Sequence, residues 1–189
     1  MAGFCVLYDA CVLYPAPLRD LLMQLALSGL YQAKWTDRIH EEWIINVLKS
    51  RPDLKREQLR SIRDLMNKHA EDSLVTGYES VIPLLRLPDE NDRHVLAAAI
   101  TASASSIVTF NLKDFPAFIL EQYGMEAIHP DKFISELIYI DPAAVCIAVK
   151  TCRKRLKKPP FDINRYLSNL ERQSLPVSVS KLREFAALL

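Results

Sequence analysis

Four acidic residues are spaced so that a chain of alternating strands and helices would bring them to one edge of a sheet: Asp9, Glu42, Asp92 and Asp114. Carboxylates held close together repel one another, and the repulsion raises the pKa of the groups involved. A divalent cation removes this cost, and oxygen ligands suit Mg²⁺ or Mn²⁺. The sequence therefore predicts a divalent metal site, provided that the fold brings the four acids together.

The composition is typical of one globular domain with an appendage. The chain has 189 residues, of which 50% are hydrophobic and 25% are charged, and such a chain can bury a sizeable core. No apolar run is long enough to span a bilayer, and the N-terminus lacks the basic start of a signal peptide. We therefore expect a soluble, cytoplasmic protein with reduced cysteines at positions 5, 11, 146 and 152.

Charge is spread unevenly, although the net charge is only +1. Residues 1–149 contain 14 Lys and Arg against 20 Asp and Glu, whereas residues 150–189 contain 10 against 3. An acidic body does not suit a protein that grips a polyanion over its whole surface. A local contact through the metal or the basic tail is expected instead. The tail candidates, which also suit a protein partner or a plain solvated helix end, are Arg153, Lys154, Arg155, Lys157 and Lys158.

Alternating strands and helices predict an α/β fold with a mostly parallel central sheet. Strands are expected near 4–8, 32–35, 81–85, 106–110 and 126–129, and helices near 18–27, 36–48, 52–71, 93–103, 117–123 and 131–139. After Asp141 and Pro142, residues 143–189 are expected to form two or three helices. The predicted organisation is one domain over 1–140 and a helical extension over 141–189.

This organisation explains why the four acids should meet. In an open parallel sheet, the ligand site lies beyond the carboxyl ends of the strands. Asp9 closes the first strand, Asp114 follows the strand near 106–110, and Asp92 opens the helix that leads into that strand. Glu42 reaches the same edge if its own helix starts there.

Three further residues are expected to contact the acids without binding the metal themselves. Asp89 and Asp92 share a helical face, as do Asn111 and Asp114, because side chains three positions apart are neighbours on a helix. Asp89 and Asn111 are therefore candidates, although an Asp before a helix is more often only an N-cap. Thr109, at the end of the strand before Asn111, is the third candidate.

At these residues the chain resembles the PIN-domain ribonucleases, and most closely the VapC-type toxins of bacterial toxin–antitoxin pairs. Four short motifs over roughly residues 4–140 carry the resemblance: the apolar strand to Asp9 with 12–15 after it, Thr36 to Glu42, the segment 88–99 around Asp92, and the segment 108–116 around Asp114. The resemblance implies a three-layer sandwich of helices around a parallel sheet. It also implies cleavage of single-stranded RNA that depends on Mg²⁺ or Mn²⁺.

The resemblance assigns roles and partners as well. Asp9, Asp92 and Asp114 would hold the metal, which activates a water molecule, while Glu42 would orient that water or bind a second ion. The expected partners are RNA, a cognate antitoxin protein and a second copy of the chain in a homodimer. Cys11 departs from the family pattern, because relatives often have Asn there, and the departure weakens the expected hydrogen-bond support of the site.

Two other functions stay open from the sequence. A Mg²⁺-dependent phosphohydrolase could use Asp9 as a nucleophile, but such enzymes usually have a second Asp two residues later, where this chain has Cys11. A PIN scaffold without catalysis would bind RNA or a protein without cutting, and the presence of all four acids argues against it. His94 is expected to be a surface or packing histidine rather than a general base.

Overall fold

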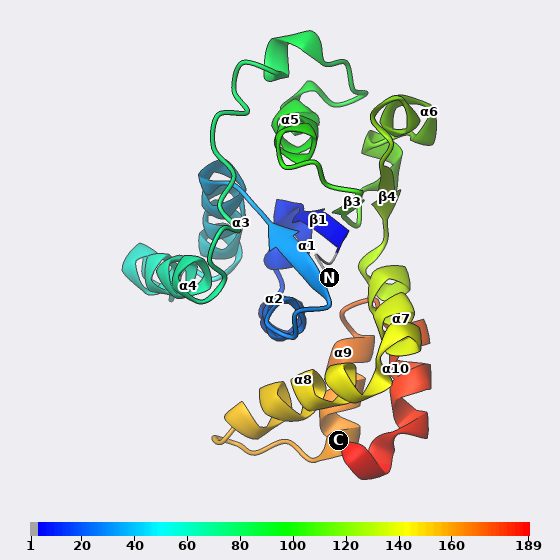
Figure 1. The fold of residues 1–189 in the computed structure, drawn as a ribbon. Helices are drawn as coiled ribbons and strands as arrows, with labels where there is room; N and C mark the ends of the chain where they lie inside the picture. The colour runs from blue at the N-terminus through cyan, green and yellow to red at the C-terminus, as the bar shows by residue number, and fades with distance from the viewer. Residues whose placement is uncertain (1–3) are drawn as a thin grey trace.

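Four parallel strands form the centre of the protein. The computed structural model describes residues 4–189, so the expectation about a signal peptide rests partly on residues outside the described range. The strands β1 (Phe4–Tyr8), β2 (Tyr31–Lys34), β3 (Ser106–Val108) and β4 (Glu126–Ile128) lie in the order β2-β1-β3-β4, and each neighbouring pair is parallel (Figure 1). The predicted α/β fold with a parallel sheet is confirmed.

β1 lies between two strands that come later in the chain. Val6 pairs with Ala33 of β2 on one side and with Ser106 of β3 on the other. The chain therefore leaves β1 toward one edge of the sheet and later returns to its other side. Open α/β sheets place ligands at the carboxyl end of a strand with such neighbours, and Asp9 stands at that end.

Helices cover both faces of the sheet, as the sandwich prediction requires. In the view of Figure 1, α5 (Arg93–Thr101) lies above the strands, where it packs against β1 and β3, and α2 (Ala16–Ala26) lies below them, where it packs against β2. The other helices before the extension are α1 (Ala10–Leu13), α3 (Asp37–Ser50), α4 (Arg56–His69), α6 (Ala117–Leu120) and α7 (Pro130–Ile140).

The helix that carries Glu42 begins where the sequence predicts. Thr36 has an extended backbone, and its hydroxyl oxygen accepts a hydrogen bond of 3.1 Å from the backbone N–H of Ile39. This cap satisfies one of the free N–H groups at the start of a helix. Ile39, Trp43 and Ile44 are fully buried, and their spacing fixes which face of α3 meets the core.

Three helices form the C-terminal part: α8 (Pro142–Arg155), α9 (Ile163–Glu171) and α10 (Pro176–Glu184). They pack against α2 and α7, with α8 and α9 beside α2 and α10 beside α7. Pro176 is the first residue of α10, a position at which a proline is well tolerated. The domain boundary between residues 140 and 141 stays a prediction, and α7, on one side of it, packs directly against α8 and α10 on the other.

One predicted strand is wrong. Residues 81–85 form a single 3-10 turn, Ile82–Leu84, instead of a strand. Pro83 sits in the middle of this segment, and a proline cannot donate a hydrogen bond to a neighbouring strand. The helix predicted over 52–71 is also shorter, because it begins at Arg56, where the side chain of Gln58 accepts a hydrogen bond from the backbone N–H of Lys55.

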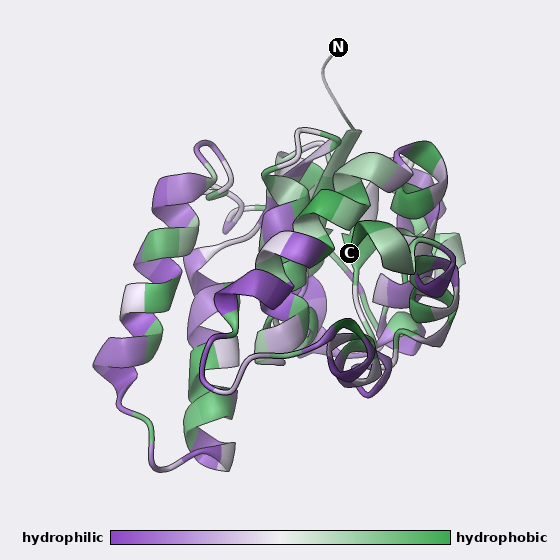
Figure 2. Cartoon of the chain, turned by 90° about the horizontal axis from the view of Figure 1, so that it is seen from below, coloured by the Kyte–Doolittle hydropathy of each residue, from purple (hydrophilic) through white to green (hydrophobic). Residues whose placement is uncertain are grey.

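One continuous hydrophobic core joins the sheet to the surrounding helices. Val6, Leu7 and Tyr8 of β1 are fully buried, and Trp35 and Trp43 are the largest side chains in the core. Figure 2 shows hydrophobic and hydrophilic residues alternating along the helices, as expected when one face of each helix packs inward. No helix among residues 4–189 is both long and apolar enough to cross a membrane.

Candidate metal centre

Asp9 directly follows the buried strand β1 and is itself only 6% exposed. Its backbone N–H donates to the carbonyl oxygen of Val108, which extends the pairing of β1 with β3 by one residue. Its Oδ2 accepts a hydrogen bond of 2.7 Å from the hydroxyl of Thr109. Oδ1 has no hydrogen-bond partner among residues 4–189. One carboxylate oxygen is thus held by the protein, and the other is free for a ligand.

The thiol of Cys11 is a second donor to the same oxygen. Its Sγ lies 2.9 Å from Asp9 Oδ2 and accepts a hydrogen bond from the backbone N–H of Phe110. Burial, followed by the charge of Asp9, raises the pKa of this thiol, so it stays protonated and can donate. The expected loss of support at position 11 is therefore made good by a weaker S–H donor.

Asp92 lies near enough to the other acids for their charges to act on its carboxyl. It ends a 3-10 turn, η2 (Glu90–Asp92), at the entrance to α5, and it is half-buried. Burial, and then the charges of Asp9, Asp89, Asp114 and Glu42 in that order, together raise the pKa of its carboxyl to about 7. The negative charges of Asp9, Glu42 and Asp114 thus all act on the carboxyl of Asp92, the fourth predicted acid.

Asp114 and Asn111 lie on the turn that follows β3. Asp114 ends the 3-10 turn η3 (Leu112–Asp114), and its backbone N–H donates to the carbonyl oxygen of Asn111. The backbone N–H of Asn111 in turn donates to the hydroxyl oxygen of Thr109 at 3.0 Å. The Asn111 side chain is exposed and makes no hydrogen bond within the described residues. Thr109 therefore connects this turn to Asp9.

Asp89 serves mainly as a cap of η2. Its Oδ1 accepts hydrogen bonds from the backbone N–H and the side-chain amide of Asn91, at 2.8 and 3.0 Å. The residue is exposed and contributes to the field at Asp92 through its charge. The N-cap alternative raised for this residue thus describes its contacts.

Glu42 is held from two sides. His94 Nε2 lies 2.9 Å from Glu42 Oε1, and Arg38 Nε donates to the same oxygen at 3.3 Å. His94 is only 1% exposed, so it is buried and does not lie on the surface. Sequence reasoning missed both contacts with Glu42. The Arg38 contact was available as an i, i+4 pair on one helix, whereas the His94 contact crosses from α5 to α3.

Two family models match the chain, and together they cover most of it. A model described as "PIN domain" matches residues 5–113, and a model described as "VapC50 C-terminal domain" matches residues 130–184. The chain belongs to the PIN-domain family. The first match contains Asp9, Glu42 and Asp92 and ends one residue before Asp114, and the second contains α7 to α10 of the C-terminal part.

A curated relative agrees with this assignment. The PIN-domain chain is 35% identical over 107 residues to a protein of Mycobacterium tuberculosis (strain ATCC 25618 / H37Rv) named "Putative ribonuclease VapC50". The aligned part is 57% of this chain and 62% of the relative, so the chain spans less than two thirds of that protein. No solved structure matches the chain.

The acids of this PIN domain suit a hard divalent cation in their chemistry, although they do not form a closed cage. As the side chains stand, no three Asp, Glu, His or Cys groups among residues 4–189 are close enough together to enclose an ion. The donors are all carboxylate oxygens, which are the ligands that Mg²⁺ and Mn²⁺ prefer. Burial is the main cause of the raised pKa of Asp92, and the negative charges of Asp9, Asp89, Asp114 and Glu42 raise it further. A cation would offset these charges.

The basic residues of the tail do not contact the acids. Arg153 donates to the carbonyl oxygens of Phe161 and Leu189, and so ties the C-terminal helices together. Arg155 forms an ion pair of 3.4 Å with Asp20 of α2. Within the described residues, the three remaining lysines of the cluster, at positions 154, 157 and 158, are exposed and form no ion pair.

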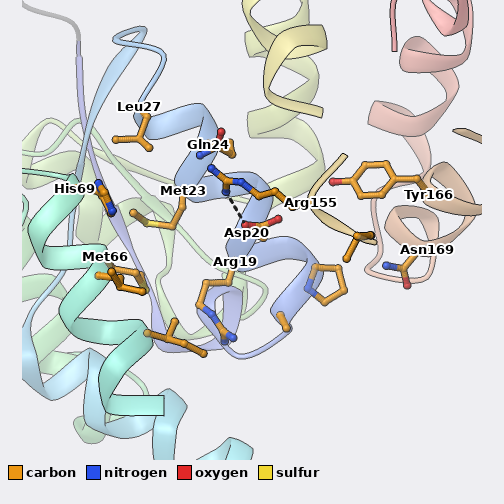
Figure 3. Close-up of a pocket in the computed structure, with 15 residues that line it drawn as sticks. Arg19, Asp20, Met23, Gln24, Leu27, Met66, His69, Arg155, Tyr166 and Asn169 are labelled. Carbon is orange, nitrogen blue, oxygen red and sulfur yellow. Dashed lines mark hydrogen bonds and ion pairs between the residues drawn. The ribbon is translucent and has the colours of Figure 1, made fainter. Parts of the chain in front are cut away.

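A separate cleft lies between the PIN domain and its C-terminal helices, with a volume of about 600 Å³. Its floor is α2, with Met23 and Leu27, and one wall is α4, with Leu65 and Met66. Figure 3 shows Tyr166 on the opposite wall, together with the Arg155–Asp20 ion pair. The lining is mainly apolar, so the cleft suits a hydrophobic surface and not a nucleic acid backbone.

Proposed function

We propose that this PIN-domain protein is a metal-dependent endoribonuclease that cleaves single-stranded RNA, and that it is the toxin of a toxin–antitoxin pair. The gathering of four acids around Asp92 at the carboxyl edge of the sheet carries the proposal. The similarity to a relative named as a VapC ribonuclease supports it. Among residues 4–189, no hydrogen bond joins a histidine side chain to a serine, threonine or cysteine, a pair that would favour another hydrolytic chemistry.

In this proposal Asp9, Asp92 and Asp114 would hold Mg²⁺ or Mn²⁺, which would supply an activated water and neutralise charge that develops on the phosphate. Thr109 and Cys11 hold Oδ2 of Asp9, so its Oδ1 is available to bind the ion. 

Glu42 acts on the attacking water in the same proposal. His94 and Arg38 hold its Oε1, so its second oxygen is available to accept a hydrogen bond from the water that attacks phosphorus. A carboxylate in this position orients the water and takes up its proton.

The test is cleavage of a mixed single-stranded RNA pool by metal-free protein, alone and with Mg²⁺ or Mn²⁺. We expect cleavage only with metal, and a loss of at least about a hundredfold in Asp9→Asn and in Asp92→Asn. Asp162→Asn is the matched control, because Asp162 is an exposed helix cap on α9. Cleavage by both site variants at the wild-type rate would contradict the proposal. Metal binding without cleavage of any RNA would favour the phosphohydrolase or the non-catalytic scaffold.

We propose the cleft between α2, α4 and the C-terminal helices as the place where a cognate antitoxin docks. An amphipathic helix with apolar residues at i, i+3 and i+4 would fill such a groove, and Leu65 offers an exposed apolar side chain at its edge, 53% accessible. We expect Leu65→Glu to weaken a complex with the antitoxin at least tenfold. Leu84→Glu is the matched control, since Leu84 is exposed but lies outside the cleft. Equal weakening by both variants would remove this assignment.

The exposed lysines of the tail are the remaining candidates for RNA contact. If Lys154, Lys157 and Lys158 bind phosphates, replacing all three with Gln weakens RNA binding and makes the logarithm of the affinity fall less steeply with the logarithm of salt concentration. An unchanged salt dependence would remove them from the RNA site. We also propose that the protein acts in the cytoplasm as a homodimer, and light scattering on the purified chain tests the dimer.

A further inference from the structure

We infer that His94 is a positioning residue for Glu42, which fixes Oε1 so that Oε2 faces the acid cluster. The inference rests on the proposed metal-dependent cleavage and goes beyond it, because it names a residue outside the four acids and the oxygen of Glu42 that acts. His94 and Glu42 belong to different helices, α5 and α3. Their contact therefore fixes the distance between the two helices on either side of the site.

The geometry sets the direction of the hydrogen bond. His94 Nε2 lies 2.9 Å from Glu42 Oε1, and an ionised carboxylate can only accept. Nε2 therefore carries the hydrogen. Arg38 donates to the same oxygen at 3.3 Å, whereas Oε2 has no hydrogen-bond partner within the described chain. Both supporting contacts converge on one oxygen, which leaves the other unused by the protein.

Burial distinguishes the two contacts. The side chain of His94 is 1% exposed, whereas that of Arg38 is 47% exposed. A hydrogen bond from a long, exposed side chain is screened by solvent and contributes little. A hydrogen bond from a buried imidazole on a helix is held by the packing around the ring. His94 is therefore the contact that fixes the carboxylate, and Arg38 is an aid.

The other nitrogen of His94 supports the same reading. Nδ1 is buried and has no hydrogen-bond partner within the described residues. A buried polar atom without a partner costs stability, so an apolar residue would fill this position better if packing were its only purpose. Among residues 4–189, the Nε2 contact to Glu42 is the one polar interaction that the ring makes, and it gives a reason for a histidine at this place.

The test uses two variants that differ in which nitrogen they imitate. Gln places an amide N–H near the position of Nε2, so His94→Gln can still donate to Glu42. Asn places its amide near Nδ1 and is too short to reach. We expect His94→Asn to lower kcat for RNA cleavage about 10–100-fold, with KM for RNA within about twofold of wild type. His94→Gln should stay within about threefold of wild type. Arg38→Met should lose less than His94→Asn.

A double-mutant cycle with Glu42→Ala separates positioning from simple packing. Four proteins are compared: wild type, His94→Asn, Glu42→Ala and the double variant. Their kcat and their Mn²⁺ affinity, measured by calorimetry on metal-free protein, form the two readouts. If His94 acts through Glu42, a readout that decreases in Glu42→Ala should also decrease in His94→Asn. The double variant should then show kcat and Mn²⁺ affinity no lower than those of Glu42→Ala.

Three results would overturn the inference. The first is that Glu42→Ala changes a readout and His94→Asn does not. The second is that the losses multiply in the double variant, and the third is that Glu42→Ala changes neither readout. Thermal unfolding is measured for each protein, and if His94→Asn does not fold, a loss in folded His94→Gln as large as that of Glu42→Ala counts against the inference. Wild type that binds Mn²⁺ but cuts no RNA contradicts the proposed function, while the Mn²⁺ affinities still decide the inference.

Discussion

The hydroxyl of Thr109 donates a hydrogen bond of 2.7 Å to Oδ2 of Asp9 and so links the carboxyl ends of β3 and β1. The same hydroxyl oxygen accepts from the backbone N–H of Asn111, at the start of the turn to Asp114. A single side chain thus sets the orientation of one acid and the path of the backbone toward another. Asp9 follows β1 and Asp114 lies on the turn after β3, and the hydrogen bonds of Thr109 connect the two segments.

Removing the hydroxyl of Thr109 should reduce the rate of RNA cleavage strongly and the free energy of unfolding only modestly. In Thr109→Val, Asp9 loses its stronger donor and the N–H of Asn111 loses its acceptor, so we expect cleavage to fall about 10–100-fold, as for other residues that orient metal ligands. The free energy of unfolding should fall by about 1–2 kcal/mol, because Thr109 is fully buried. Thr109→Ser keeps the hydroxyl and should keep most of the activity. Equal activity of Thr109→Val and Thr109→Ser would show that the hydrogen bond does not matter for cleavage.

The raised pKa of Asp92 predicts how pH and metal removal affect stability. Its pKa rises from an ordinary 3.8 to about 7, so the folded state prefers the protonated carboxyl. The resulting stabilisation is fully present below pH 3.8 and is lost as pH rises through 7. Metal-free wild type should therefore lose stability relative to Asp92→Asn by about 1–2 kcal/mol between pH 4 and pH 8, after allowance for solvent screening.

Denaturant unfolding of both proteins with EDTA, at pH 4, 6 and 8, measures this difference. Because the two proteins share every other titrating group, their difference reports Asp92 together with its coupling to the neighbouring acids. Adding Mn²⁺ at pH 8 should stabilise wild type and have less effect on Asp92→Asn. A difference that does not depend on pH would mean that burial and the neighbouring acids do not raise the pKa of Asp92 in the folded protein, and would contradict the prediction.

The sequence predicted the sheet edge well because its signals there are local. An apolar run that ends in Asp9 predicts a buried strand followed by an acid, and the fully buried Val6, Leu7 and Tyr8 confirm the strand. Thr36 as the cap of α3 could be predicted in the same way. The placement of acids after strands then needs only the parallel order of the sheet. The ligand set itself stays a prediction.

The parts that failed depend on contacts between distant segments. An apolar run over 81–85 predicts a strand, but a strand also needs a neighbour to pair with, and Pro83 interrupts this one. The sequence left His94 open as a surface or a packing histidine, and the structure places it on the buried face of α5. Its contact with Glu42 depends on how closely α5 and α3 approach each other. The sequence pattern of one helix does not determine how closely it approaches another helix.

A buried histidine makes the fold sensitive to acid. His40 is fully buried, its Nδ1 accepts a hydrogen bond of 3.0 Å from Trp43, and its Nε2 lies 3.1 Å from Oδ1 of Asn67. Burial lowers the pKa of His40 from 6.5 to about 4. The stabilisation is therefore present above pH 6.5 and is lost as pH falls toward 4, since only the unfolded chain binds the proton in this range.

We expect this one group to account for about 2–3 kcal/mol of stability between pH 6.5 and pH 4. Chemical denaturation of wild type and His40→Gln over this range measures it, and the pH dependence of the variant should be shallower by that amount. His69→Gln is the matched control, because His69 is exposed. Parallel pH curves for wild type and His40→Gln would contradict the prediction.

Asp131 fastens the last helix of the protein to α7. Its two carboxylate oxygens accept hydrogen bonds from the backbone N–H groups of Val177 and Ser178, at 2.9 and 2.7 Å, and so cap α10 from another helix. The carboxylate is 6% exposed, and a negative charge at the start of a helix is favourable. Asp131→Ala should therefore lower the free energy of unfolding by about 2–3 kcal/mol, because two backbone N–H groups lose their acceptor and that of Ser178 is buried. Asp162→Ala, which removes an exposed cap within α9, should cost about 1 kcal/mol or less. Urea unfolding of the two variants compares them directly, and equal losses would mean that Asp131 acts only as an ordinary cap and not as the attachment of the C-terminal helices.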